Sequence, residues 1–266
     1  MTTTLLENPQ AAPCQDVRAA SMQRASAIVE LRQYALHPGR RDTLIELFER
    51  EFVETQEAAG MELIGQFRDL DDPDRFVWLR GFSQRETRAS ALRAFYGGWC
   101  WRAHRDAANA TMIDSDDVLL LRPSRPVGGF ALSCRDDAAT QDVGVVQATI
   151  YQLASDDACD FVRYFEQDWL PLLWEANVGV VATLVSERAP NDFPALPVRE
   201  DASVFVWFSC HASVDALAQA QARIEQALEW APRIADALAS HLAAPPQTLR
   251  LAPTRRSRLR GSVDRA

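Results

Sequence analysis

An internal repeat is the strongest constraint on how this chain folds. Tyr34 and Tyr151 match at an offset of 117 positions, inside similar segments that each combine a strand-like run with a helix-like run. The offset grows to 129 where Phe76-Val77-Trp78 matches Phe205-Val206-Trp207, and to 130 near the ends of the two segments. Offsets that change only where loops differ in length are typical of a duplicated domain. We therefore expect two divergent copies of one domain in this 266-residue chain.

Each copy shows the same order of predicted elements. Segments in which apolar and polar residues alternate predict strands, whereas apolar residues at a spacing of 3.6 predict helices. The resulting order is β-α-β-β-α-β, the ferredoxin-like unit. In the first copy the predicted strands are residues 28–34, 63–68, 76–82 and 118–122, and the second predicted helix spans residues 86–112.

A sheet of this kind is covered by helices on one face and left bare on the other. Two such units can bury their bare faces against each other. The predicted fold class is therefore α+β, with two tandem ferredoxin-like βαββαβ units that pack sheet to sheet as a pseudo-dimer resembling a dimeric α/β barrel. The predicted boundaries are a flexible N-terminal tail at 1–27, a first domain at 28–123, a linker at 124–142, a second domain at 143–253 and a basic C-terminal tail at 254–266.

Composition excludes several classes of function. The chain has no lysine, so all 28 basic residues are arginine, which excludes a lysine Schiff base and a Walker-type phosphate loop. The five cysteines are scattered and form no C-x-x-C pair, so neither a disulfide framework nor a metal site is expected. A net charge of −9 disfavours nucleic-acid binding. Because there is no long apolar run, we expect no membrane partner and a cytoplasmic location.

Several motifs of the first copy occur in a characteristic order: Glu30-Leu31-Arg32-Gln33-Tyr34, Pro38-Gly39-Arg40, Asp72-Pro73-Asp74, Phe76-Val77-Trp78 and the segment from Trp101 to Asn109. With these motifs the first copy resembles the NIPSNAP family over residues 28–123. The second copy resembles it much less, because it lacks the Pro-Gly-Arg and Asp-Pro-Asp turns. The resemblance implies a dimeric α/β-barrel fold, whose superfamily includes cofactor-free monooxygenases, isomerases, cyclases and haem proteins. It transfers no uniform set of catalytic residues.

Strand parity gathers the candidate site residues of the first copy. Glu30, Arg32 and Tyr34 share one face of their predicted strand, and their apolar alternates are expected to meet the helices. The polar face is therefore expected to point into the barrel lumen or toward the partner sheet. The candidates for substrate binding are Arg32, Arg68, Trp78, Arg80 and Trp101, and those for catalysis are Glu30, Tyr34 and His104.

Three arginines in a covered space would suit a small anionic substrate such as a carboxylate or an enolate. The alternative is that these charges pair with one another or across an interface. The second copy has neutral residues at the matching positions, for example Thr149 and Ser209. The asymmetry places the predicted functional site in the first copy.

His104 is a candidate general base or axial haem ligand, and its counterpart in the second copy is Ile234. A solvated helix histidine is the alternative. The predicted function is a cofactor-independent enzyme of small-molecule metabolism, of monooxygenase, isomerase or cyclase type, that acts on a small organic anion. A non-catalytic binding or interaction protein and a haem-binding barrel enzyme are the other candidates, and homodimerisation is compatible with each.

Overall fold

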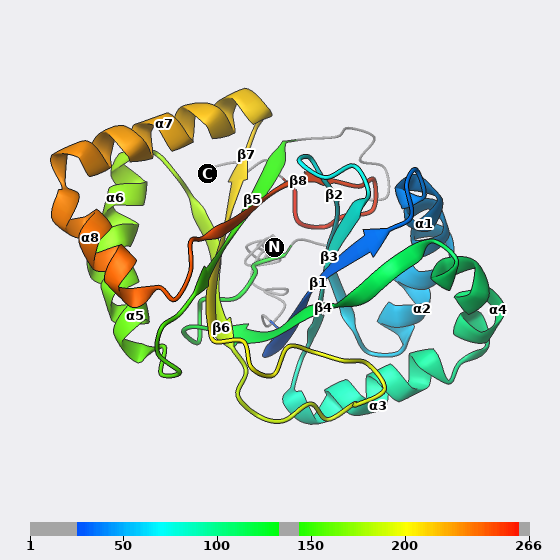
Figure 1. The fold of residues 1–266 in the computed structure, drawn as a ribbon. Coiled ribbons are helices and arrows are strands. Elements are labelled where there is room, and N and C mark those ends of the chain that lie inside the picture. The colour runs from blue at the N-terminus through cyan, green and yellow to red at the C-terminus, as the bar shows by residue number, and fades with distance from the viewer. Residues whose placement is uncertain (1–25, 133–143, 261–266) are drawn as a thin grey trace, which may run out of the picture.

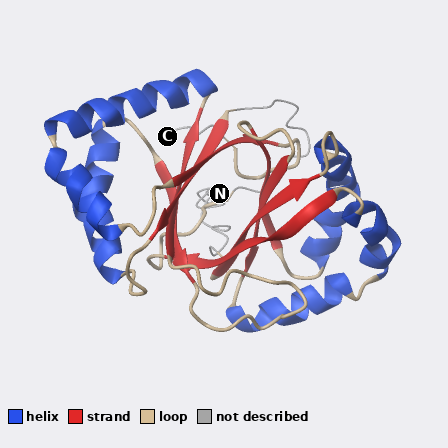
Figure 2. Ribbon diagram, viewed as in Figure 1, coloured by secondary structure: helices blue, strands red, loops and turns tan. Residues whose placement is uncertain are grey.

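The computed structural model describes residues 26–132 and 144–260, and the two halves of the chain have the predicted order of elements (Figures 1 and 2). The first half comprises β1 (Ile28–Leu36), α1 (Arg41–Leu47), η1 (Phe48–Phe52), α2 (Val53–Ala58), β2 (Glu62–Asp69), β3 (Arg75–Phe82), α3 (Arg85–Tyr96), α4 (Trp99–Asn109) and β4 (Met112–Pro123). The second half comprises β5 (Val145–Gln152), α5 (Cys159–Tyr164), η2 (Phe165–Trp169), α6 (Leu170–Glu175), β6 (Val180–Ser186), β7 (Val204–His211), α7 (Val214–Trp230), α8 (Pro232–His241) and β8 (Gln247–Pro253). The segments η1 and η2 are π-helical turns.

The eight strands form one closed antiparallel barrel in the order β1-β3-β2-β8-β5-β7-β6-β4. Two junctions join the halves: Phe67 in β2 pairs with Pro253 in β8, and Leu121 in β4 pairs with Ser186 in β6. Closure leaves no unpaired strand edge in the barrel. The helices of the first half cover one side and those of the second half the opposite side (Figure 2). The predicted pseudo-dimer of two sheets is confirmed.

The barrel interior is apolar and is built by both halves. Leu31, Val77 and Leu79 of the first half lie in the same buried cluster as Val206 and Phe208 of the second. Because these side chains exclude water from a core shared by both sheets, each half depends on the other for burial of its inner face.

The predicted orientation of the charged strand face is wrong. Tyr34 and Trp78 belong to a second cluster with Phe48 and Phe52 of the helical layer, and so the Glu30, Arg32 and Tyr34 face points toward the helices. The alternates, including Leu31, point into the lumen. In a barrel closed by two sheets both faces are buried, and the lumen shared by both sheets takes the more apolar set.

Two predicted segments also differ from the structure. The helix predicted at 86–112 is two helices, α3 and α4, which are separated by Gly97 and Gly98. The segment predicted as a basic C-terminal tail packs against the barrel over residues 254–260, where Leu259 is buried and its amide donates to the Ile64 carbonyl oxygen at 2.8 Å. Of the expected linker, residues 124–132 include the buried Phe130, which lies in the barrel cluster. The rest of the linker, the N-terminal tail and residues 261–266 fall largely outside the described residues.

Among the described helices, none combines the length and the apolar character that crossing a bilayer would require.

The shared lumen predicts that the two halves unfold together. Leu31→Ala removes a side chain that is 0 % exposed, and the free energy of unfolding should fall by about 2–5 kcal/mol. The control Val127→Ala, at a position 94 % exposed, should change it by less than about 0.5 kcal/mol. Chemical denaturation followed by circular dichroism and tryptophan fluorescence measures both. Two separate transitions, with only one shifted by Leu31→Ala, would contradict the shared core.

Candidate functional site

Strand pairing between β1 and β3 brings the candidate charges together. Glu30 lies opposite Arg80, and Arg32 lies opposite Trp78. Residues directly paired across two strands project from the same face of the sheet, so these four side chains form one patch under the helices. The helix α3 adds Arg88 from its buried side.

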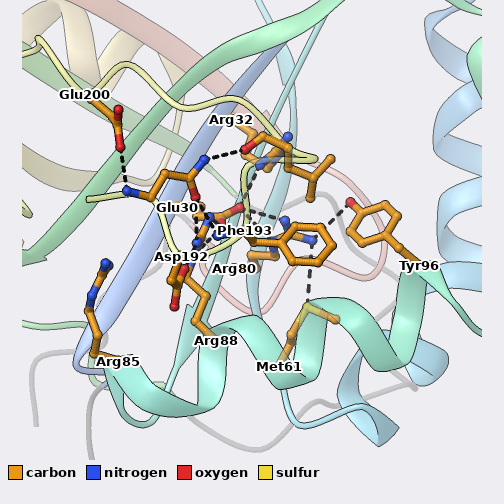
Figure 3. Close-up of polar contacts among 12 residues, drawn as sticks. Glu30, Arg32, Met61, Arg80, Arg85, Arg88, Tyr96, Asp192, Phe193 and Glu200 are labelled. Carbon is orange, nitrogen blue, oxygen red and sulfur yellow. Dashed lines mark hydrogen bonds and ion pairs between the residues drawn. The ribbon is translucent and has the colours of Figure 1, made fainter. Parts of the chain in front are cut away.

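The Glu30 carboxylate is the centre of this patch. It accepts hydrogen bonds from Arg32 Nη1 at 2.7 Å, from Arg80 Nε at 2.8 Å and from Arg88 Nε at 2.8 Å. All four side chains are buried, and Figure 3 shows the arginines converging on the carboxylate. Three guanidinium groups around one carboxylate leave an excess of positive charge.

The protonation states follow from these contacts. Burial alone would raise the pKa of the Glu30 carboxyl, but Arg80, Arg32 and Arg88 together hold that pKa far below its ordinary value. Glu30 is therefore an anion at neutral pH, and its lowered pKa makes it unsuited to act as a general base. Burial raises the pKa of the Tyr34 phenol, whose oxygen accepts a hydrogen bond from Arg32 Nε at 3.0 Å.

Aromatic rings surround the arginines. The guanidinium carbons of Arg32 and Arg80 lie 5.5 Å and 5.1 Å from the centroid of the Trp78 ring. Tyr96 accepts a hydrogen bond from Arg80 Nη1 at 3.3 Å, and its ring centroid is 4.9 Å from that of Trp101. Cation–π contacts of this kind stabilise a buried guanidinium that lacks a full set of carboxylate partners.

Unpartnered polar atoms lie in the same patch. Gln66 of β2 pairs with Trp78 and so projects from the same face. The Trp78 indole Nε1 and both polar atoms of the Gln66 side chain are buried and have no hydrogen-bond partner among the described residues. Buried polar groups usually have partners, so a water or a ligand is expected beside these atoms.

A loop of the second half covers the patch. The segment between β6 and β7 runs along α3 in Figure 1 and places Asp192 against Arg88, with which it forms an ion pair. Phe193 stacks on Tyr96 at a centroid distance of 6.2 Å (Figure 3). The Pro190 carbonyl oxygen accepts a hydrogen bond from Arg85. The two halves therefore build this site jointly.

A pocket of about 210 Å³ opens next to the covered patch. Its floor is Leu120 of β4, which lies opposite Glu30 across the β1–β4 pairing. Its walls come from the covering loop, namely Glu187, Arg188, Ala189, Pro190, Val198, Arg199 and Glu200. The pocket therefore lies beside the charged patch, but neither Glu30 nor its three arginines line it.

The structure brings together most, but not all, of the predicted site. Arg68 lies apart, because its guanidinium pairs with Asp42 in a half-exposed ion pair. Sequence reasoning missed Arg88 and Asp192. The helical spacing of α3 could have indicated Arg88 as a buried charge, whereas no local signal links Asp192 to the first half.

His104 also lies outside the arginine patch. Its Nε2 is 3.4 Å from Glu51 Oε2, and its side chain is 28 % exposed. The neighbouring Trp101 does reach the patch, through Tyr96. His104 therefore does not lie with Glu30 and Tyr34, and a catalytic role for it stays a prediction.

The equivalent layer of the second half contains neutral polar groups. Gln147 Nε2 donates to Thr149 Oγ1 at 3.1 Å, and Ser209 Oγ lies 2.8 Å from His211 Nε2. Burial, and to a lesser extent Arg223, lowers the pKa of His211, which favours the neutral ring. The two halves thus share a fold but have different buried chemistry.

Comparisons with known proteins agree with this fold. Residues 29–125 match the NIPSNAP family model, and no curated protein sequence matches the chain. A candidate monooxygenase of Lactobacillus acidophilus has 13% identity and a TM-score of 0.51, covering 86% of this chain and 94% of its own. One from Fusobacterium nucleatum has 8% identity and a TM-score of 0.53, covering 86% and 93%. An anthrone oxidase-like protein has 13% identity and a TM-score of 0.50, covering 90% and 99%.

The central role of Glu30 predicts a large effect of its neutralisation. Glu30→Gln leaves three buried guanidinium groups without their shared carboxylate, and the free energy of unfolding should fall by about 3–5 kcal/mol. The control Asp42→Asn removes the carboxylate of an exposed pair and should cost less than about 1 kcal/mol. Urea denaturation at neutral pH measures both. Equal effects would contradict the assignment of Glu30 as the organising charge.

Acidification tests the lowered pKa of Glu30. A carboxyl with a lowered folded-state pKa binds fewer protons in the folded than in the unfolded protein, so its stabilisation is complete above about pH 4.3 and is lost as the pH falls further. The wild type should therefore lose stability below that pH more steeply than Glu30→Gln. Denaturation curves between neutral pH and about pH 3 measure the slopes, and parallel slopes would contradict the lowered pKa.

Proposed function

We propose that this chain binds a small organic anion beneath the helices of its first half. Two findings support the proposal: residues 29–125 match the NIPSNAP family, and the barrel has the same fold as two candidate monooxygenases. We further propose that the chain is a cofactor-independent enzyme of monooxygenase type. The observation that carries the proposal is the excess positive charge around Glu30, covered by a loop from the other half of the chain.

The charge balance favours a monoanion. Arg32, Arg80 and Arg88 contribute three positive charges, against which Glu30 and Asp192 supply two negative ones. A net buried charge costs several kcal/mol unless an opposite charge compensates it. A carboxylate, phenolate or enolate bound beside the arginines would restore neutrality.

The surroundings favour an aromatic or enolic molecule. Trp78, Tyr96, Trp101 and Phe193 offer planar apolar surface next to the guanidinium groups. The indole Nε1 of Trp78 and the Gln66 amide would give a ligand two further polar contacts. Entry would proceed through the pocket at Leu120, with displacement of Phe193 from Tyr96.

The proposed chemistry uses the arginines as electrostatic stabilisers. A phenol or a β-keto acid held against them would ionise more readily, because the resulting oxyanion is stabilised by preorganised donors. The ionised substrate would supply all four electrons that reduce dioxygen: one oxygen atom would replace two hydrogen atoms of the substrate as a new carbonyl oxygen, and the other would leave with those hydrogens as water. No bound cofactor would be needed. Tyr34, which stays protonated, would serve as a hydrogen-bond donor, and Glu30 would hold the arginines in place.

A non-catalytic role is the second candidate. It is favoured by the contacts of Glu30 itself, which already engages all three arginines and leaves the patch internally paired. In that case the charged patch would serve to fix the β6–β7 loop on α3, and the first half would act as a binding or interaction module.

A ligand panel separates binding from a purely structural role. Aromatic hydroxy acids and β-keto acids at about 100 times their dissociation constant should add about 2.7 kcal/mol to the stability of the folded protein, measured as a rise in melting temperature. Arg32→Ala and Arg80→Ala should each lower the affinity for these ligands at least tenfold. Their positional counterparts in the second half, Thr149→Ala and Ser209→Ala, are the controls and should bind as the wild type does. A flat response of the wild type to the whole panel would favour the structural role.

Turnover is tested with the compounds that bind. The purified protein, without added nucleotide or metal, should consume dioxygen in proportion to the substrate lost, as measured with an oxygen electrode and by mass spectrometry of the product. Arg80→Ala should lower the rate by about 100-fold, the range found when one oxyanion-stabilising donor is removed. Tight binding without oxygen uptake would contradict the monooxygenase assignment and leave the binding site standing.

A further inference from the structure

A second group of functional side chains lies outside the arginine patch, where η1 faces α4. Glu51 projects from η1, and Cys100 and His104 project from α4. The possible ligand atoms of these three residues, a carboxylate oxygen, the thiol sulfur and an imidazole nitrogen, all lie within 4.8 Å of one another. None of the three contributes to the contacts around Glu30.

The local backbone explains how the three side chains meet. Cys100 and His104 are four residues apart on one helix, so they project from the same face. Glu51 lies in the π-helical turn, a feature often found at functional sites. The Glu51 carbonyl oxygen accepts a hydrogen bond from the Cys100 thiol at 3.2 Å, which holds α4 against this turn.

We propose that Glu51, Cys100 and His104 bind a zinc-class divalent transition-metal ion. Carboxylate, thiolate and imidazole are the three ligand types that Zn²⁺ takes in proteins, at bond lengths of about 2.0–2.3 Å. Tetrahedral bonds of these lengths separate neighbouring ligand atoms by about 3.3–3.8 Å. The distance of 3.4 Å between His104 Nε2 and Glu51 Oε2 already lies in that range.

The three side chains differ in exposure, so that an ion could reach the site from the solvent. The Glu51 side chain is 24 % exposed and that of His104 is 28 % exposed, whereas Cys100 is buried at 4 %. The thiol thus forms the inner wall and the other two ligands the mouth. Three protein ligands leave a fourth position for water, the arrangement of zinc sites that are not purely structural.

The second half provides an internal contrast. Its π-helical turn η2 is retained, and the repeat offset places Asp168, also a carboxylate, at the position of Glu51. The same comparison places Ile234 at the position of His104, and the position of Cys100 falls on Trp230, the last residue of α7. The turn is therefore retained without the thiol and the imidazole, and the presence of these two ligands in the first half alone indicates a role beyond packing.

Metal binding at this site is coupled to proton release. The thiol must lose its proton to the solvent as the sulfur–metal bond forms, so that M²⁺ and the Cys100 thiol yield the metal thiolate and one proton. The metal keeps its oxidation state, and no other reactant is needed. Binding should accordingly tighten as the pH rises.

The test is titration of the full-length protein with Co²⁺, followed by displacement with Zn²⁺. The wild type should bind about one Co²⁺ with tetrahedral visible bands and a near-ultraviolet thiolate-to-cobalt charge-transfer band, and should release about one proton. His104→Ala and Glu51→Gln should weaken binding more than about 100-fold, because even changes to outer-sphere partners cost 10–100-fold. Cys100→Ser should abolish the charge-transfer band.

Controls address the other thiols and folding. Cys159→Ser and Cys210→Ser, which change the other described cysteines, should retain the wild-type spectrum, as should the double variant Cys14→Ser with Cys134→Ser. If Cys100→Ser fails to fold, His104→Ala decides with the same spectrum. A wild type without the charge-transfer band, or a band that survives His104→Ala and Glu51→Gln, overturns the proposal. Neither result bears on the anion site around Glu30, which shares none of these ligands.

Discussion

When two open sheets bury their inner faces against each other, the backbone N–H and C=O groups of their edge strands also need hydrogen-bond partners. Here the β2–β8 and β4–β6 pairings meet that requirement within one chain. The lumen so formed is filled by apolar side chains of both halves. Polar chemistry is therefore displaced to the outer faces of the two sheets, beneath the helices, where loops from the neighbouring half can reach it.

The charged patch illustrates how a buried ion cluster can be built from a short stretch of sequence. Alternation along β1 places Glu30 and Arg32 on one face, and strand pairing adds Arg80. In a buried cluster with more cations than anions, the guanidinium groups repel one another. Here the ring of Trp78 and the carboxylate of Asp192 offset part of this repulsion, through a cation–π contact and an ion pair. Its internal ion pairs suit a rigid structural element, whereas its excess positive charge suits the binding of an anion.

Much of the architecture was accessible from the sequence. The matched segments predict two equivalent units, and alternation in the strands correctly groups Glu30, Arg32 and Tyr34 on one face. The alternation could not say which face is the lumen, because both faces of a closed barrel are buried and only their relative polarity differs. The NIPSNAP resemblance of residues 28–123 corresponds to the family match at 29–125.

The site was less accessible, for a reason that lies in long-range contacts. Arg88 and Asp192 are 104 positions apart and come from different halves, so no local pattern connects them. Arg68 has the correct parity, but at the end of β2 it finds Asp42 of α1 at the surface. His104 and Cys100 show helical spacing in the sequence, yet only the π-helical turn brings Glu51 to them.

The loop that carries Asp192 and Phe193 occurs in only one half of the barrel, which is possible because both halves belong to one polypeptide. In a two-chain barrel with twofold symmetry every substitution occurs twice, and each subunit would have to serve as both receptor and cover. Covalent linkage lifts that restriction, since the second half can lengthen a loop while the first keeps its own short. The two halves can then change independently, and here the second half supplies the loop that covers the charged patch of the first.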